Sequence, residues 1–421
     1  DMSVLKAYEL EKKWEVLIQG RSVGEKIGSG KANVIKNVSD ISKFKKWEVL
    51  VTDMTDPDWE PIMKIASAIV TNRWGRTCHA AIISRELWIP CVVWTNNGTE
   101  IIPNGKDITV DCSGGSDWVV YKWKLPFKIN EINITKMPKT KTHITMNVWS
   151  PDQAFEERFI PNDWVWLARE EFIINSYIKV HPLALLHFDE LKDENVKKQI
   201  ADLTVWYKNK ADYFIDKLAE WVSTIAAAFY PKRVILRLSD FKSNEYANLI
   251  WWAQFEPKED NPMIGRRWAS RYYSEKYKEA FWLECKAVLK VREEMWLDNL
   301  DVMIPFPRTL DEAKKVIKTM SEFGLKQHKN GLQVMWMCEI PSNVILAEEF
   351  LDIFDGFSIG SNDLTQLTLW VDRDSELVAD VYDEKNLAVK KLVEHVIKVA
   401  NKKKKYLFFL QESIWWAHTY A

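Results

Sequence analysis

The residues that most clearly suggest chemistry lie in one stretch, NRWGRTCHAAIISRELWIP, at positions 72–90. Its single histidine, His79, stands where a loop is expected to turn into a helix, and two arginines precede it. A phosphoryl group on the imidazole would lie beside the free N–H groups at the helix start, where partial positive charge favours anions. Ala80 and Ala81 leave room for a reacting group to approach. These residues alone also fit a histidine with a purely structural role.

A second set of reactive side chains stands at predicted strand ends in the second half of the chain. Glu339 ends the segment MWMCE, and Asp363 follows FSIGSN. Two carboxylates from adjacent strands can hold a hard cation such as Mg²⁺ and leave positions for substrate oxygens. The alternative is that an acid caps the next helix, which for Asp363 is the segment LTQL.

Three arginines are expected near the same strand ends. Arg169 ends VWLAR, Arg237 lies in VILRLSD, and Arg267 follows NPMIG. Arginine matches carboxylate and phosphate oxygens with two-point contacts. Each arginine alone would fit a surface ion pair. Three that converge beside an acid pair suggest a small phosphorylated acid as the ligand.

The elements expected to position His79 form a compact α/β unit. Residues 57–67 predict a short helix, and residues 121–142, with several Lys, Pro and Thr, predict a linker. Residues 1–20 are predicted as helix or tail. Four segments are predicted as strands: 49–53, 68–72, 91–94 and 107–112. The predicted domains are therefore 1–120, a linker over 121–142, and 143–421.

The second domain is predicted to be a (β/α)8 barrel of the TIM type, with its site at the carboxyl ends of the strands. Residues 312–323 and 387–400 carry apolar stripes of helical period, which indicate core packing. Residues 189–230 are predicted as a helical insertion, and an eighth strand is inferred before residue 261 from the architecture. Seven strands are predicted: 144–148, 165–169, 234–238, 301–306, 332–340, 354–360 and 406–411.

Length and charge restrict the class of protein. A chain of 421 residues predicts two or three domains. Its 58 basic and 60 acidic residues nearly cancel, so no nucleic acid or other polyanion partner is implied. No apolar run approaches the roughly 18 residues that suggest a membrane span. The five cysteines form no CxxC pair, and the first residues lack a signal-peptide core, so a reduced, cytoplasmic setting is expected.

The balance of tryptophan and glycine is abnormal. There are 22 Trp and only 14 Gly, whereas average usage of about 7% predicts roughly 29 Gly. Tryptophan also stands where turns favour glycine, as at Trp88 and the pair Trp251–Trp252, although it does not readily adopt φ > 0. Either these positions are substituted, or the printed sequence is partly wrong.

The stretch TDMTDPDWEPIMKIASAIVTN, followed by GRTCHAAIISREL, resembles the phosphohistidine domain of the PEP-utilising enzymes, the family of PEP synthases, pyruvate phosphate dikinases and enzyme I. In that family the histidine of TCHAA carries the phosphoryl group, which maps this role onto His79. The family pattern also has glycine at positions that are tryptophan here: Trp74, Trp88, Trp94, Trp164, Trp166, Trp268 and Trp370.

The second domain resembles the PEP/pyruvate barrel of the same family. The segments carrying this resemblance are ILRLSDFKSNEYANLI, NPMIGRRWASRYYS, CEIPSNVILAEEF and DGFSIGSNDLTQLTLWVDRDS, and the first is most similar to PEP synthases. The resemblance implies that Glu339 and Asp363 bind Mg²⁺. It implies that Arg169, Arg237 and Arg267 grip phosphate and carboxylate, and that Gly360, Ser361, Asn362 and Asp363 contact the substrate.

The implied reaction has two halves. ATP phosphorylates His79 and leaves AMP and phosphate, and pyruvate bound in the barrel then takes the phosphoryl group and becomes PEP. The family's ATP-binding domain is not found in these 421 residues, so we expect this chain alone not to use ATP. Association into homo-oligomers is expected for barrels of this size.

One departure from the family pattern affects the acid–base step. The last barrel strand of the family carries a cysteine that handles the proton on the pyruvate methyl group, and aligning on Gln411 places Phe409 there. Phenylalanine cannot transfer a proton, so the C-terminus is either misread or incomplete, or the function is lost. Two rival functions therefore remain: a PEP-dependent relay to a carrier protein, and a non-catalytic assembly subunit.

Overall fold

The computed structural model describes residues 4–23, 26–55, 59–73, 84, 89–93, 95–113, 118–133, 140, 142–148, 151–242, 249–256, 258–373, 375–378 and 380–410. The chain divides into two compact units, Asp1–Pro138 and Lys139–Ala421. No helix of the described residues is long and apolar enough to cross a membrane.

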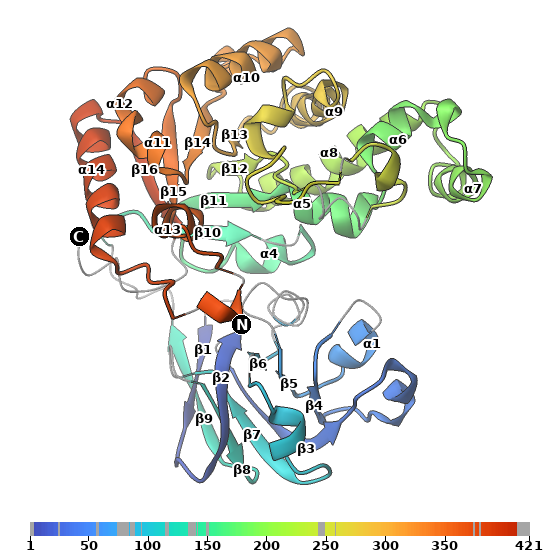
Figure 1. Cartoon of the computed structure of the whole chain (residues 1–421), viewed down its shortest axis with the longest axis vertical. Coiled ribbons are helices and arrows are strands. Elements are labelled where there is room, and N and C mark those ends of the chain that lie inside the picture. The colour runs from blue at the N-terminus through green and yellow to red at the C-terminus, as the bar shows by residue number, and fades with distance from the viewer. Residues whose placement is uncertain are drawn as a thin grey trace. The chain divides into compact units, whose positions relative to one another are not determined.

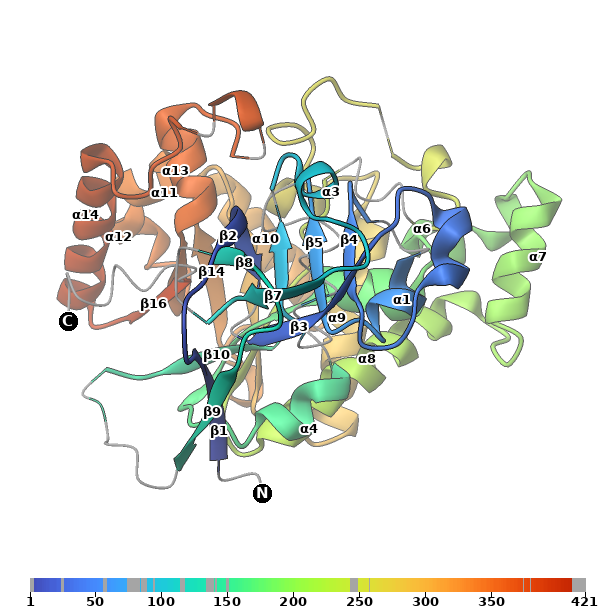
Figure 2. The ribbon, with the colours of Figure 1, turned by 90° about the horizontal axis from the view of Figure 1, so that it is seen from below.

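The first unit is built on a closed β-barrel with the strand order β2-β6-β5-β4-β3-β7-β8 (Figure 1). Its strands are β2 (Val16–Val23), β3 (Ile27–Val34), β4 (Val49–Thr52), β5 (Ala68–Thr71), β6 (Cys91–Val93), β7 (Asp107–Asp111) and β8 (Trp118–Lys122). The short helices α1 (Glu60–Met63) and α3 (Gly98–Ile101) accompany them (Figure 2). Strands β3, β4, β5 and β6 pair in parallel, and the buried apolar runs of β4, β5 and β6 suit strands covered on both faces.

Two predictions for this unit are wrong. Residues 1–20, predicted as helix or tail, form β1 (Val4–Leu10) and the start of β2. Residues 127–133, predicted as part of a linker, form β9 (Phe127–Asn133), which pairs antiparallel with β1 in a two-stranded sheet. None of the described side chains of this sheet is fully buried, so neither strand shows the continuous apolar run of a core strand. Each strand is specified by a partner that lies far away along the chain.

The second unit is a curled, all-parallel, seven-stranded sheet in chain order. Its strands are β10 (Thr145–Val148), β11 (Trp164–Arg169), β12 (Val234–Arg237), β13 (Leu300–Ile304), β14 (Val334–Cys338), β15 (Gly356–Gly360) and β16 (Tyr406–Leu410). All seven predicted strands are confirmed, and the TIM-type class holds. The eighth strand is not found in the described residues before 261. Residues 252–254 form a 3-10 helix there, and Ile250 makes only an isolated bridge to Val180.

Helices lie on the outer face of this sheet (Figure 1). The amphipathic segments predicted at 312–323 and 387–400 correspond to α10 and α14, and each buries its apolar stripe. The predicted helical region 189–230 contains α7 and α8. The helices are α4 (Ala154–Glu157), α5 (Glu170–Ile173), α6 (Pro182–Leu186), α7 (Glu194–Leu203), α8 (Lys210–Phe229), α9 (Lys278–Leu289), α10 (Leu310–Glu322), α11 (Pro341–Ile345), α12 (Ala347–Phe350), α13 (Ser361–Leu369) and α14 (Leu387–Lys403).

Two apolar layers hold this unit together. The larger one packs between the sheet and the helices, and the smaller one fills the concave side of the sheet with Trp166, Ile235, Met303 and Met335. Within the smaller layer the indole Nε1 of Trp166 donates a hydrogen bond of 3.0 Å to Ser358 Oγ. The interior below the strand ends is therefore filled, and chemistry is restricted to the rim.

Candidate active site

The register of the parallel sheet places two of the predicted arginines side by side. Arg169 is the last residue of β11 and Arg237 the last residue of β12, and the two are paired in the ladder between these strands. Neighbouring parallel strands are separated by about 4.8 Å, so the two positions face the same rim. This confirms that both arginines stand at strand ends on one edge of the sheet.

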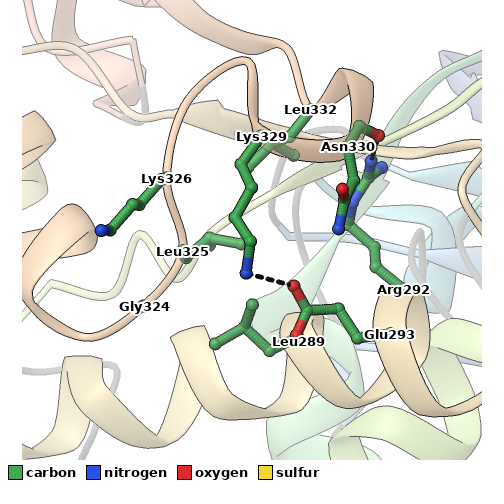
Figure 3. A pocket seen from close by; sticks show the side chains of 9 residues that line it. All are labelled: Leu289, Arg292, Glu293, Gly324, Leu325, Lys326, Lys329, Asn330 and Leu332. Carbon is green, nitrogen blue, oxygen red and sulfur yellow. Dashed lines mark hydrogen bonds and ion pairs between the residues drawn. The ribbon is translucent and has the colours of Figure 1, made fainter.

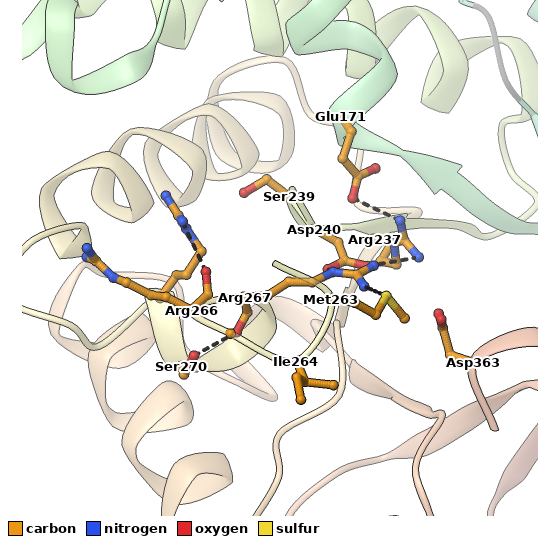
Figure 4. A network of polar contacts seen from close by, with 12 residues as sticks. Glu171, Arg237, Ser239, Asp240, Met263, Ile264, Arg266, Arg267, Ser270 and Asp363 are labelled. Carbon is orange, nitrogen blue, oxygen red and sulfur yellow. Dashed lines mark hydrogen bonds and ion pairs between the residues drawn. The ribbon is translucent and has the colours of Figure 1, made fainter. Parts of the chain in front are cut away.

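Arg237 is buried and held by two carboxylates (Figure 4). Its Nη2 donates to Glu171 Oε1 over 2.9 Å, and its Nη1 lies 3.6 Å from Asp240 Oδ2. Burial alone would lower the pKa of Arg237, but the negative charges of Glu171, Asp240 and Glu339 outweigh burial and raise the pKa above its usual value. The guanidinium therefore stays charged. Its Nε is buried and has no hydrogen-bond partner within the part of the chain that the structure describes. Arg237 therefore keeps a donor for a ligand.

Arg267 reaches the same carboxylate from the loop before residues 268–271. Its Nε and Nη2 donate to the two oxygens of Asp240 over 3.1 and 3.3 Å, and its Nη1 contacts Met263 Sδ at 3.0 Å. Asp240 therefore joins two buried guanidinium groups that would otherwise repel each other. The predicted convergence of Arg237 and Arg267 is observed, as Figure 4 shows.

Sequence analysis missed the two acids that hold these arginines. Asp240 follows Arg237 by three residues, and Glu171 follows Arg169 by two. Because both lie just beyond a strand end, their spacing from an arginine was a usable signal. Without a fold it did not distinguish an ion pair from an exposed turn.

Glu339 and Asp363 lie at the ends of the neighbouring strands β14 and β15. Both are buried. Burial, with the nearby Asp363 charge, raises the pKa of Glu339 to about 8. Burial also opposes ionisation of Asp363, but Arg373, Arg267, Lys242 and Arg237 together lower its pKa.

The pair has the properties expected of a cation site. Glu339 Oε2 and Asp363 Oδ1 are buried and accept no hydrogen bond from any described residue, although Arg373 Nη1 lies 3.4 Å from Asp363 Oδ1. Such orphaned oxygens fit a hard divalent ion, which takes one or two carboxylates and fills its other positions with substrate oxygens or water. No group of three or more acidic, histidine or cysteine side chains in the described residues could hold a metal alone.

The loop after β15 is shaped around Glu339. A Cβ at Gly360 would meet Glu339 Oε1 and Cγ at 2.4 Å, so only glycine fits there. Ser361 and Asp363 are buried in the first turn of α13. Tyr382 Oη donates to Asn362 Oδ1 over 3.2 Å, which orients the amide. Gly360 is the N-cap residue of α13 and has no side chain to cap the helix start.

Some residues singled out in the sequence fall outside the part of the chain that the structure describes. His79 lies outside them, as does Gln411. Of the stretch before His79, Arg73 is described, and its Nε contacts Asp53 Oδ2 at 3.0 Å. The backbone of Phe409 pairs with Ile359 in the ladder between β15 and β16, which places position 409 beside the loop that begins at Gly360.

The second unit contains another pair of buried acids, Glu170 and Glu284. Glu170 is fully buried, and neither carboxylate oxygen has a hydrogen-bond partner among the described residues. Glu284, on α9, accepts from Ser239 Oγ over 2.6 Å. Burial raises the pKa of Glu284 to about 8. Burial and the nearby Glu284 charge raise the pKa of Glu170 well above its usual range. At neutral pH this pair therefore retains protons that the unfolded chain releases.

Replacing Glu170 with glutamine is expected to stabilise the protein at alkaline pH. The raised pKa means that the folded chain holds a proton above pH 4.5, where the unfolded chain has lost it, so parent stability falls as pH rises toward 8. The variant lacks this loss, so its free energy of unfolding should exceed that of the parent at pH 8 and equal it near pH 4.5. Thermal unfolding from pH 4.5 to 8.5 measures this. Glu322→Gln, on the exposed face of α10, is the control, and a constant difference across pH would contradict the expectation.

A surface pocket elsewhere in the second unit has a different character (Figure 3). It lies between residues 289–293 and 324–332, at the amino ends of β13 and β14, away from the strand ends that carry the arginines. Lys329 Nζ and Glu293 Oε1 form an ion pair of 2.8 Å across it, and Arg292 donates to backbone carbonyls, including that of Asp298. These charged side chains are paired with other groups of the protein, so the pocket is not part of the candidate active site.

The four cysteines that the structure describes, Cys91, Cys112, Cys285 and Cys338, are buried and unbridged. Burial raises the pKa of Cys285 and Cys338, so neither is poised as a nucleophile.

The rim of this TIM-type sheet thus carries buried arginines beside a pair of buried carboxylates. Comparison with known proteins is specific. The family model described as the PEP-binding domain of PEP-utilising enzymes matches residues 127–409, and the mobile domain of the same enzymes matches residues 44–115. The chain belongs to the PEP-utilising enzyme family.

Relatives named phosphoenolpyruvate synthase are similar over most of the chain. The Synechocystis protein is 58% identical over 399 residues, covering 94% of this chain and 49% of its own length. The Escherichia coli protein is 50% identical over 404 residues, covering 96% and 51%. This chain thus spans about half the length of these curated relatives. Among solved structures, an HpcH/HpaI aldolase/citrate lyase family protein from Burkholderia cenocepacia is 12% identical with a TM-score of 0.36, covering 66% of this chain and 83% of its own.

Proposed function

We propose that this chain forms the phosphohistidine and pyruvate-binding parts of a PEP synthase. Pyruvate would be converted to PEP by a phosphoryl group carried on His79. The observation that carries this proposal is the pair of buried guanidinium groups, Arg237 and Arg267, held together by Asp240 beside the acids Glu339 and Asp363. The family membership and the names of the similar relatives support it.

In this proposal the arginines bind the carboxylate and phosphoryl oxygens. Arg237 has a buried donor to spare, and Arg169 stands beside it in the sheet. Glu339 and Asp363 would hold Mg²⁺, which when bound supplies positive charge to the enolate oxygen of pyruvate. Loss of a methyl proton of pyruvate to water would give the enolate, whose oxygen then forms the new bond to phosphorus as the bond between phosphorus and the His79 nitrogen breaks. The arginines balance the negative charge of the phosphoryl oxygens during this transfer.

The first half-reaction is also part of the proposal. In the whole enzyme ATP would phosphorylate His79 and yield AMP and phosphate, through parts of the relatives that this chain does not match. We also keep a cytoplasmic setting and a homo-oligomeric state as proposals. Pyruvate and PEP are the proposed small-molecule ligands.

Incubation of the purified chain with PEP and Mg²⁺ tests the proposal. The expected result is an acid-labile phosphoryl group on His79, located by mass spectrometry, with release of pyruvate. The variant His79→Gln should lose the label, whereas His395→Gln, at an exposed histidine of α14, should keep it. A folded chain that binds PEP but leaves His79 unlabelled would overturn the transfer step. A folded chain that does not bind PEP would overturn the proposed ligand and favour the assembly-subunit alternative.

A further inference from the structure

Tryptophan occupies left-handed backbone repeatedly in this chain. Eleven non-glycine residues that the structure describes have positive φ, and six of them are tryptophan. These six are Trp47, Trp123, Trp251, Trp268, Trp296 and Trp370, with φ between 54° and 77°. A Cβ crowds the backbone in this region, so glycine adopts it freely, Asn and Asp do so occasionally, and a bulky residue is an outlier.

The side chains at several of these positions gain little from packing. Trp296 and Trp370 are 82% and 79% exposed, and Trp47 is 67% exposed. Trp370 follows the last residue of α13, and its N–H donates to the carbonyl of Gln366. Helices commonly end with a left-handed residue at this place, and glycine is the usual choice. The backbone at Trp370 is therefore built as a glycine helix stop.

The buried side chain of Trp268 also fits its surroundings poorly. Trp268 has a φ of 60° and is nearly fully buried, yet no described residue accepts a hydrogen bond from its indole N–H. Buried tryptophans normally find a partner for this group. The ring lies 4.1 Å from Phe306 and within 5 Å of the Arg267 and Arg308 guanidinium groups. It therefore fills space directly beside the arginine that we place in the ligand site.

From these two independent signs, backbone and side chain, we infer that glycine is the residue that the cell places at these six positions. The composition agrees, with 22 tryptophans and 14 glycines. One codon explains why a single residue type replaces glycine each time. UGA, which some genetic codes assign to tryptophan, differs from the glycine codon GGA only in its first base. A glycine transfer RNA that reads UGA would insert glycine wherever this sequence shows such a tryptophan.

The inference also bears on the ligand site, although it does not rest on the proposed function. Glycine at position 268 removes the ring between Phe306 and the two arginines, Arg267 and Arg308. Space then opens beside the Arg267 guanidinium group. The form of the protein made in its own cells would thus have a wider site than the printed sequence allows.

Peptide mass spectrometry of the protein isolated from its source organism tests the inference directly. Glycine is expected in the peptides that cover positions 47, 123, 251, 268, 296 and 370. Tryptophan at these positions would overturn the inference. The result is independent of PEP binding, so it distinguishes this inference from the proposed function.

Variants of the printed sequence test the backbone argument separately. Trp296→Gly and Trp370→Gly should each raise the melting temperature by about 2 to 4 °C, because glycine relieves the left-handed strain. Trp206→Gly is the matched control, since Trp206 is 91% exposed but is not among the residues with positive φ. It should leave the melting temperature unchanged or lower it. Equal changes at all three positions would overturn the argument.

Discussion

Replacing Arg237 with lysine is expected to weaken PEP binding by about 10- to 100-fold, even though the positive charge is kept. The fork of Arg237 binds Glu171 and approaches Asp240 while a buried Nε remains for a ligand. A lysine has one ammonium group and cannot serve both acids and the ligand. Loss of the charge-assisted hydrogen bond from Nε to the ligand, at about 1.5–3 kcal/mol, corresponds to this change in affinity. Isothermal titration of PEP in the presence of Mg²⁺ measures it.

Arg266→Lys is the matched control for this prediction. Arg266 precedes Arg267, but its side chain points away from Arg237 and donates to Ser274 Oγ over 3.1 Å (Figure 4). Its replacement should leave PEP affinity within a few-fold of the parent. Circular dichroism and thermal unfolding should show that both variants are folded. Equal losses in the two variants, or unchanged affinity in Arg237→Lys, would remove Arg237 from the ligand site.

The positions of the candidate site residues could be predicted because they follow from the order of strands. Repeated βα units predict a parallel sheet, and in such a sheet every strand ends at the same rim. Arg169, Arg237 and Asp363 were therefore expected on one edge of the sheet, whatever the conformations of the loops. The continuous apolar runs were enough to locate the strands, because a strand that is covered on both faces is apolar along its length.

The contacts that make the site work could not be predicted in the same way. Asp240 holds two arginines that are 30 positions apart, and only the folded loop before Trp268 brings Arg267 back to it. Likewise β1 and β9 are largely exposed and pair across more than 100 residues, so neither carries the continuous apolar run that marks a core strand. Long-range pairings of this kind depend on tertiary structure rather than on the residue pattern of one segment.

Replacing Glu339 with glutamine is expected to abolish Mg²⁺-dependent PEP binding and, at the same time, to raise thermal stability. Glu339 and Asp363 are two buried acids with orphaned oxygens, so the metal-free protein pays for their mutual repulsion. Glutamine keeps the shape of the side chain and removes one charge, which should raise the melting temperature by a few degrees at pH 7.5. The same change removes one of two anionic ligands, and PEP affinity with Mg²⁺ should then fall to its value in EDTA.

The opposite directions of these two effects identify a residue kept for ligand binding rather than for stability. Glu256→Gln provides the contrast, because Glu256 is also buried but bonds Arg271 Nη1 over 2.9 Å and lies 3.1 Å from His181 Nε2. Removing its charge leaves Arg271 uncompensated, so this variant should lose stability while PEP binding keeps its dependence on Mg²⁺. Calorimetric unfolding and PEP titration with Mg²⁺ or EDTA measure both properties. If Glu339→Gln were destabilised and still bound PEP in an Mg²⁺-dependent manner, Glu339 would be a structural acid and the metal would have to be held elsewhere.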